Sequence, residues 1–387
     1  SGLIDADAVL PEVEEKVLRE EVERDKDDPS AASFRESWHY KTRRIRSQSP
    51  FGSHPSWQLV SVIVKSGADL RQEQLALQLI GEMQRIWQED GVPVWVCFFR
   101  ILPLSSDAGL IETIPDAISV HSIKKHAYAQ KWNQPGLAFS LYDYFVREFG
   151  GGKPGGERFR RAQDAFMRSL AGYCVVCYLL GVKDRHNGNI LLNTTGHLIH
   201  IDFGFMLSNA PGSVPGFGFE LAPFKLPQEY VDILGGVGSV KFQEFRSLVK
   251  WALLSVRKRG ERVWGLVEVM ERDSTLPCFT GYTPKPSVTA QPSADAAPIT
   301  TPFLSVPSAI PITSPTSPSL PADSESNATG KQKEHRHPVT ASLKERFHLS
   351  LTEPQLGTLV DGLIDKSIGS VYTRLYDAFQ YYANGVL

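Results

Sequence analysis

Two short stretches decide the fold of this chain: Gly181-Val-Lys-Asp-Arg-His-Asn-Gly-Asn-Ile-Leu-Leu192 and His200-Ile-Asp-Phe-Gly204. An apolar run ends the first stretch and another leads into the second, and the residues 193–196 between them, Asn-Thr-Thr-Gly, are typical of a tight turn. The pattern predicts a hairpin of two strands, over 189–192 and 197–201, with acidic and amide side chains gathered at its open end.

The open end of this hairpin has the residue types that phosphoryl transfer from ATP requires. The reaction needs oxygen ligands for a metal ion, a group that orients the attacking hydroxyl and a cation on the phosphates. Asn189 follows Asp184 by five residues and Asp202 ends the returning strand, so the three side chains can converge. Upstream, Lys65 ends a predicted strand and Glu73 lies eight residues further, inside a predicted helix. A carboxylate there can hold the lysine over the phosphates.

The remaining elements indicate a mixed α and β protein. Segments rich in branched residues predict strands over 57–65, 92–104 and 109–114. Apolar residues at helical spacing predict helices over 69–87, 162–180, 226–270 and 342–387, with an irregular stretch that includes the glycine-rich run 150–156 before the second. Residues 283–340 are dominated by Pro, Ser, Thr and Ala and predict a disordered insertion, because they bury too little apolar area to offset their ordering entropy.

Composition excludes several classes of protein. The 387 residues include 41 Lys and Arg against 43 Asp and Glu, a formal charge of −2, which argues against a polybasic nucleic-acid binder. Four cysteines are too few for a disulfide scaffold and favour a reducing compartment. No apolar run approaches the roughly 20 residues needed to cross a bilayer, so we expect any membrane contact to be peripheral. The start at Ser-Gly leads us to expect a fragment of a longer protein.

The order of Asp184, Arg185, His186 and Asn189 resembles that of the phosphoinositide kinase family. The catalytic loop of this family has the sequence Asp-Arg-His-x-x-Asn, whereas ordinary protein kinases have His-Arg-Asp. More narrowly, the chain resembles the type III beta phosphatidylinositol 4-kinases in the segments 59–65, 69–73, 171–180, 182–189, 200–205 and 375–381. The resemblance covers about 49–387 apart from insertions. It implies an α+β, two-lobed protein-kinase-like fold with a small β-rich N-lobe and a larger, mainly helical C-lobe.

The resemblance also implies a division into five parts. These are a partly helical or disordered lead-in (1–48), the N-lobe (49–115), the first part of the C-lobe with the catalytic and activation loops (116–282), the disordered insertion (283–340) and the terminal helices of the C-lobe (341–387).

The family places ATP between the lobes. The resemblance implies that Lys65 binds the phosphates, that Glu73 orients this lysine, and that Asn189 and Asp202 bind Mg2+, with Mn2+ as an alternative. The residues implied at the adenine are Ile111, Glu112, Thr113, Ile114 and Ile201. The turn implied over the phosphates contains Ser49, Phe51 and Gly52, and it lacks the Gly-x-Gly-x-x-Gly of protein kinases.

The catalytic base is left open between two residues. Asp184 has the position that spacing equates with the base of protein kinases, whereas the ordinary pKa of His186 is closer to the working range.

The activation segment favours a singly charged lipid. Between Asp202 and Pro227 the only basic side chain is Lys225, and one lysine suffices for one phosphodiester, whereas a multiply phosphorylated inositol needs several cations. We therefore expect Lys225, Phe224 and Arg185 to bind phosphatidylinositol. Phosphorylation at the 4-hydroxyl comes from the resemblance alone.

Two apolar regions permit two interpretations, insertion into a membrane or packing in the core. They are the phenylalanines of the activation segment, Phe217, Phe219 and Phe224, and the stripe Val371, Leu375, Phe379 and Tyr382 of a predicted last helix.

The function predicted is transfer of the ATP γ-phosphate to the 4-hydroxyl of phosphatidylinositol. The alternatives are a phosphoinositide-kinase-related protein Ser/Thr kinase and a catalytically inactive scaffold that binds nucleotide. By resemblance we expect a cytoplasmic monomer, peripheral on Golgi membranes, that binds Rab-type and Arf-type GTPases and Golgi adaptor proteins mostly outside this region, and no nucleic acid.

Overall fold

A computed structural model describes residues 36–133, 137–210, 222–280 and 339–370, together with residues 373, 374, 376, 377, 385 and 387. By its internal contacts the chain divides into one unit of residues 1–283 and 338–387 and a second of residues 284–337. The predicted insertion 283–340 thus lies outside the described residues except for its last two, Val339 and Thr340, which are already buried in a helix. The five predicted boundaries otherwise remain predictions.

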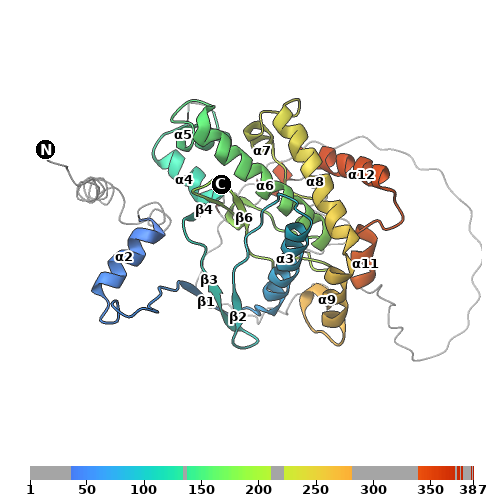
Figure 1. The fold of residues 1–387 in the computed structure, drawn as a ribbon, viewed down its shortest axis with the longest axis horizontal. Helices are drawn as coiled ribbons and strands as arrows, with labels where there is room; N and C mark the ends of the chain where they lie inside the picture. Colours follow the sequence, from blue (N-terminus) through green and yellow to red (C-terminus); the bar gives the residue numbers. More distant parts are fainter. Residues whose placement is uncertain are drawn as a thin grey trace, which may run out of the picture. The chain divides into compact units, whose positions relative to one another are not determined.

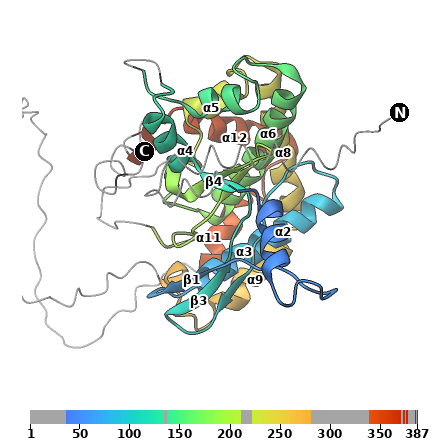
Figure 2. The ribbon, with the colours of Figure 1, turned by 90° about the vertical axis from the view of Figure 1, so that its left-hand side faces the viewer.

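The first sheet has three antiparallel strands, β1 (Val62–Ser66), β2 (Ile101–Pro103) and β3 (Ala108–Glu112), in the order β1-β3-β2. In its register, Lys65 of β1 lies opposite Gly109 of β3. A Cβ atom at Gly109 would come within 2.7 Å of both the Leu102 carbonyl oxygen and the Leu70 side chain, so this position requires glycine. Helix α3 (Arg71–Glu89) follows β1 and lies beside the sheet in both views (Figures 1 and 2).

The second half of helix α3 is bound to the larger lobe. Its apolar face is buried, as the predicted helical spacing requires. Near its end, Trp87 Nε1 donates a hydrogen bond to the Ala252 carbonyl (2.9 Å). Arg262 pairs with Glu82, and Asp90 accepts from Ser255 Oγ at 2.7 Å. These contacts tie the helix to α8 (Val240–Lys258) and α9 (Glu261–Glu271).

The second sheet confirms the predicted hairpin. It contains β4 (Ala117–Ser119), β5 (Ile190–Asn193) and β6 (Leu198–His200), all antiparallel, in the order β4-β5-β6. Helix α6 (Gly156–Leu180) packs against β6 of this sheet and against α8, and it is largely buried (Figure 1). Gly181 ends α6 in the left-handed conformation (φ 58°), so the chain turns there into the loop before β5.

The remaining helices surround these two sheets and α6. They are α2 (Trp38–Gln48), α4 (Val120–Ala129), α5 (Leu141–Glu148), the 3-10 turn η2 (Asn187–Asn189), α7 (Gln228–Ile233), α10 (Pro277–Thr280), α11 (Val339–Arg346) and α12 (Glu353–Ser367). A small sheet-containing N-lobe and a larger helical C-lobe confirm the α+β, two-lobed prediction.

Three predictions of elements were wrong in extent. The strand predicted over 57–65 is confined to Val62–Ser66, and that over 92–104 to Ile101–Pro103. The reason in the second case is that the preceding extended segment bonds to α6: Trp95 N–H donates to the Arg168 carbonyl (3.2 Å) and Cys97 N–H to the Tyr173 hydroxyl (3.1 Å). The irregular stretch expected before 162–180 contains β4, α4 and α5, and α6 already begins at Gly156.

Candidate active site

The first part of the site is an ion pair between the first sheet and α3. Lys65 Nζ lies 2.9 Å from Glu73 Oε1, and the carboxylate is almost fully buried. Burial alone would lower the pKa of Lys65, but the hydrogen bond and charge of Glu73, with the charge of Asp202, raise it instead. Lys65 is therefore a fixed cation, as the prediction for a phosphate-binding lysine requires.

The second part is the catalytic loop between α6 and β5. Asn189 Nδ2 donates to the Asp184 carbonyl oxygen (3.0 Å), which folds the loop back on itself. His186 Nε2 lies 3.8 Å from Asp184 Oδ1, so the two candidate bases are neighbours. The Tyr376 hydroxyl donates to the same Asp184 oxygen.

The hydrogen bonds of His186 define where its proton lies. Gly188 N–H donates to Nδ1 (3.1 Å), so Nδ1 carries no proton and the neutral imidazole carries it on Nε2, the nitrogen that faces Asp184. Burial lowers the pKa of His186, although the charges of Asp184 and Asp202 oppose this effect. The Nε2–H of the neutral ring thus faces Asp184, at a distance longer than a hydrogen bond.

The third part is Asp202, which follows β6. Asp202 and Asp184 both have left-handed backbones, with φ of 58° and 63°. Such conformations are costly for residues other than glycine and are retained where the surroundings impose them, often at functional sites. Gly204 N–H donates to Asp202 Oδ1 (3.2 Å), and Arg185 donates to the carbonyl oxygens of Asp202 and Ile201.

Charge interactions connect the three parts. Asp202 raises the pKa of Lys65, and it also contributes to the raised pKa of Glu73, for which burial is the main cause. Asp202 likewise acts on His186. The structure thus brings together Lys65, Glu73, Asp184, His186 and Asp202.

The donor set fits a magnesium-like ion bound together with phosphates. Asp202 offers a carboxylate, and Asn189 Oδ1 has no hydrogen-bond partner among the described residues. Mg2+ prefers oxygen ligands and is usually bound by one or two protein side chains plus substrate phosphates. In the described ranges no group of three or more His, Cys, Asp or Glu could hold a metal by itself.

The predicted adenine site is partly occupied by internal bonds. Glu112 N–H donates to the Arg100 carbonyl (2.9 Å) and Thr113 N–H to the Ser61 carbonyl (3.1 Å). Among the described residues, no backbone hydrogen bond is made by the Ile114 N–H, which leaves it for a base. The apolar side chains predicted here, Ile111, Ile114 and Ile201, are half-buried beside the core.

The predicted phosphate-covering turn is a tight, exposed loop. Ser49 Oγ accepts from Trp57 Nε1 (3.3 Å), and Arg46 Nε donates to the Gly52 carbonyl (2.7 Å). A Cβ atom at Gly52 would meet the Arg46 carbonyl oxygen at 1.9 Å, so only glycine fits. Phe51 is exposed. Within the described ranges, no hydrogen bond or ion pair joins this turn to Lys65.

The three predicted substrate residues line one small cavity, but each is already engaged. Lys225 Nζ pairs with Asp377 (2.7 Å) and donates to Asn187 Oδ1 (3.0 Å). Phe224 is buried in the hydrophobic core, and Arg185 is buried beneath the chain at Asp202. The cavity measures about 20 Å³. In this conformation it is too small for an inositol head group.

Two contributors to the site were not predicted from the sequence. Asn187 lies within the catalytic loop and donates from Nδ2 to the Leu387 carbonyl (2.9 Å), and Tyr376 contacts Asp184. Tyr376 belongs to the segment 375–381 that supported the family resemblance, which is the one signal that could have indicated it.

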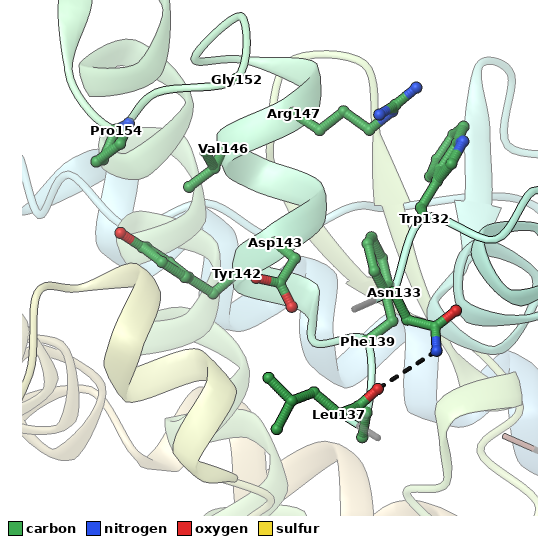
Figure 3. Close-up of a pocket in the computed structure, with 11 residues that line it drawn as sticks. Trp132, Asn133, Leu137, Phe139, Tyr142, Asp143, Val146, Arg147, Gly152 and Pro154 are labelled. Carbon is green, nitrogen blue, oxygen red and sulfur yellow. Dashed lines mark hydrogen bonds between the residues drawn. The ribbon is translucent and has the colours of Figure 1, made fainter. Parts of the chain in front are cut away.

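A separate pocket of about 390 Å³ contains none of the predicted site residues. Figure 3 shows it between α5 and the segment before it, where Trp132, Phe139 and Tyr142 line it and the Arg147 guanidinium lies 3.9 Å from the Trp132 ring centre.

Comparison with known proteins decides the family. A model described as phosphatidylinositol 3- and 4-kinase matches residues 59–280, which include every part of the site described above except the turn at 49–53 and the residues near the C-terminus. The chain belongs to the phosphatidylinositol 3- and 4-kinase family. Members of this family are kinases, which use ATP with a divalent metal ion.

The names of individual relatives agree with this family assignment. Proteins named phosphatidylinositol 4-kinase beta from Xenopus tropicalis, Rattus norvegicus and Homo sapiens are each 40% identical over 364 residues, 94% of this chain. The aligned region is 36% of each relative's length, so this chain spans about a third of the proteins it matches.

The predictions that apolar residues of this kinase insert into a membrane remain largely untested by the structure. Phe217 and Phe219 lie outside the described residues, as do Val371, Leu375, Phe379 and Tyr382 of the predicted last helix. Phe224 packs in the core, which favours the packing interpretation for that residue. No helix in the described part combines the length and apolar character needed to cross a bilayer.

Proposed function

We propose that this chain is the catalytic part of a 1-phosphatidylinositol 4-kinase, which transfers the γ-phosphate of ATP to the 4-hydroxyl of phosphatidylinositol. The observation that carries the proposal is the convergence of the Lys65–Glu73 ion pair with Asp184, Asn189 and Asp202. An ion-paired lysine, two acids and an amide oxygen are the groups that phosphoryl transfer from ATP requires.

The residues that would hold the nucleotide follow from this set. Lys65 would bind the phosphates with Glu73 fixing its position, and Asn189 and Asp202 would hold Mg2+, or Mn2+ in its place. When bound, the metal ion neutralises charge that develops on the phosphates. Ile114 would offer its free N–H to adenine, between the apolar side chains of Ile111 and Ile201.

The hydrogen bonds favour Asp184 over His186 as the base. His186 already has a proton on Nε2, and Gly188 N–H occupies Nδ1, so the ring has no free lone pair near Asp184. The inositol oxygen would form its bond to the γ-phosphorus as the bond to the bridging oxygen of ADP breaks. The hydroxyl proton would pass to the Asp184 carboxylate, and His186 would orient that carboxylate. Tyr376 must first give up its bond to Asp184.

Substrate selection would depend on a single cation near the head group. Lys225 is the one basic side chain of the segment 203–226, and its pairing with Asp377 must open to receive a phosphodiester. Arg185 is better described as a positioning residue than as a substrate ligand, since its guanidinium is committed to main-chain carbonyls.

The setting proposed for this reaction rests on the family resemblance. We infer a cytoplasmic monomer that is peripheral on Golgi membranes. Rab-type and Arf-type GTPases and Golgi adaptor proteins are the inferred partners, mostly through regions outside this chain.

One assay tests the proposed function. The protein is incubated with labelled ATP and Mg2+, and with vesicles of phosphatidylinositol, vesicles of a bisphosphorylated phosphoinositide or a protein substrate. We expect label on phosphatidylinositol, with phosphate at the 4-position by chromatography of the deacylated product. Label on protein alone would indicate a protein kinase. Nucleotide binding without any transfer would indicate a scaffold, and either result would overturn the proposal.

A further inference from the structure

The backbone around Asp202 is held by side chains at four consecutive carbonyl oxygens. Arg185 donates to the carbonyls of Ile201 (2.8 Å) and Asp202. Gln72 Nε2 donates to the next two, those of Phe203 (3.2 Å) and Gly204 (2.6 Å). Arg185 is part of the loop motif, whereas Gln72 comes from α3, more than 130 residues away in the sequence.

The orientation of the Gln72 amide is fixed on both sides. Its Oε1 accepts from the Cys278 N–H (2.9 Å) of α10, and its Nε2 faces two carbonyl oxygens. A reversed amide would place oxygen against carbonyl oxygen and nitrogen against N–H, so only one orientation satisfies every partner. The side chain is 4% exposed, and water therefore cannot replace these bonds.

A second buried amide side chain donates to one of these carbonyl oxygens. Asn209 Nδ2 donates to the Gly204 carbonyl (2.8 Å), and Asn209 is also 4% exposed. Its Oδ1 has no partner within the described part of the chain. The Gly204 carbonyl thus accepts from both Gln72 and Asn209.

Gln72 occupies the first turn of α3, directly before Glu73. Glu73 points to Lys65 and Gln72 to the segment that follows Asp202, so one helical turn contacts both halves of the site. The helix itself is fastened to the larger lobe through Glu82, Trp87 and Asp90. Gln72 therefore projects from a helix that is bound to the larger lobe.

We propose that Gln72 is a positioning residue that holds Phe203 and Gly204 against α3 and thereby keeps the left-handed Asp202 in the place where its carboxylate meets the metal ion. The proposal rests on the proposed function, in which Asp202 is a metal ligand. Groups that orient metal ligands also determine how well the metal ion is bound, and their loss typically costs about 10–100-fold in metal affinity or activity.

The test compares Gln72→Glu with a matched control on the same helix. Glutamate has the same shape and can still accept from the Cys278 N–H, but it cannot donate to the two carbonyls. Gln74→Leu is the control, because Gln74 is a half-buried glutamine of the same helix and its Nε2 likewise donates to a carbonyl, that of Ile101 in β2 (3.1 Å). Two measurements need no turnover: binding of a fluorescent ATP analogue with and without Mg2+, and amide hydrogen exchange over 203–206 in the free protein.

We expect Gln72→Glu to leave metal-free nucleotide affinity unchanged within about twofold, while the gain in affinity from Mg2+ and kcat each fall about 10–100-fold. Exchange over 203–206 should become faster, with the rest of α3 as protected as before. Gln74→Leu should change none of these.

Equal effects from Gln72→Glu and Gln74→Leu, or a parallel loss of metal-free affinity, would overturn the proposal, because either would indicate general damage to α3. If Gln72→Glu does not fold, Asn209→Ala replaces it; it removes the other donor to Gly204, and the same selective loss of the Mg2+ effect is expected in smaller measure. An unchanged Mg2+ effect in Asn209→Ala would then count against the proposal. Failure of the wild-type protein to phosphorylate lipid would refute the proposed function, whereas the exchange and binding results stand apart from it.

Discussion

The two sheets have the same number of strands and the same antiparallel pairing, but they differ in how they are buried. In the first sheet, Ile63, Val64 and Leu102 are 53%, 73% and 55% exposed. In the second, Ile190 and Leu198 are fully buried, and His200 is 4% exposed. Each sheet nevertheless supplies one half of the site, Lys65 from the first and Asn189 and Asp202 from the ends of the second.

This difference explains why the two halves are held by different means. A metal ligand needs exact placement, and Asp202 obtains it from a buried hairpin and from the side chains that bind the carbonyls around it. Lys65 lies on an open sheet, so its position depends on one ion pair with a separate helix. We infer that the second sheet provides rigidity and the first adaptability.

The largest expected effect compares the two halves of the site directly. Asp202→Ala should lower kcat on phosphatidylinositol about 10³-fold or more, since it leaves Asn189 alone of the two proposed metal ligands. Lys65→Met should cost about 10²-fold, because the metal ion still neutralises part of the phosphate charge. The exposed Arg85→Met on α3 is the control and should keep full activity. A greater loss in Lys65→Met than in Asp202→Ala would reverse the order of the two halves.

A smaller effect concerns stability. Leu198→Ala in the second sheet should lower the free energy of unfolding by about 2–4 kcal/mol, because it leaves a cavity in a packed core. Val64→Ala in the first sheet should lower it by about 0.5 kcal/mol or less, because that side chain faces solvent. Chemical denaturation of both variants measures the difference. Similar losses would mean that the first sheet is covered in solution.

The smallest effect is a pH dependence of the second sheet. Burial lowers the pKa of His200 far below its ordinary value and that of His197 to about 4. Below the ordinary histidine pKa near 6.5, these histidines bind protons in the unfolded chain but stay neutral in the folded chain. The free energy of unfolding therefore falls as the pH is lowered from 7 toward 5. His200→Asn should remove about one proton, or about 1.4 kcal/mol per pH unit, from this slope.

A control for the pH dependence is available in His54→Asn, at an exposed position of the small lobe. The slope of unfolding free energy against pH should be unchanged in this variant. If the slope in His200→Asn equals that of the wild type, groups other than His200 cause the loss of stability at low pH.

Much of the second sheet could be predicted because its determinants are local. The hairpin, its turn and the three polar residues at its open end lie within 184–202, and the Lys65–Glu73 pair spans eight residues. Strand length was harder to predict for 92–104, because branched residues suit both a strand and an extended segment that packs on a helix.

The contacts that were missed join distant parts of the chain. Gln72 meets Gly204 across 132 positions, and Tyr376 meets Asp184 across 192. Lys225 was predicted to bind a head group because it is the only basic side chain between Asp202 and Pro227, yet Asp377 reaches it from 152 residues away. Pattern alone cannot specify such pairings, because they arise from tertiary packing.

The attachment of α3 to α8 and α9 determines how a nucleotide can enter. In many two-lobed enzymes the whole small lobe swings away, but here the helix beneath the sheet stays with the large lobe through Trp87, Glu82 and Asp90. We therefore expect nucleotide entry and product release to move the exposed layer of strands more than α3. Compounds that wedge beneath this layer would slow the cycle without disturbing the groups that grip the metal.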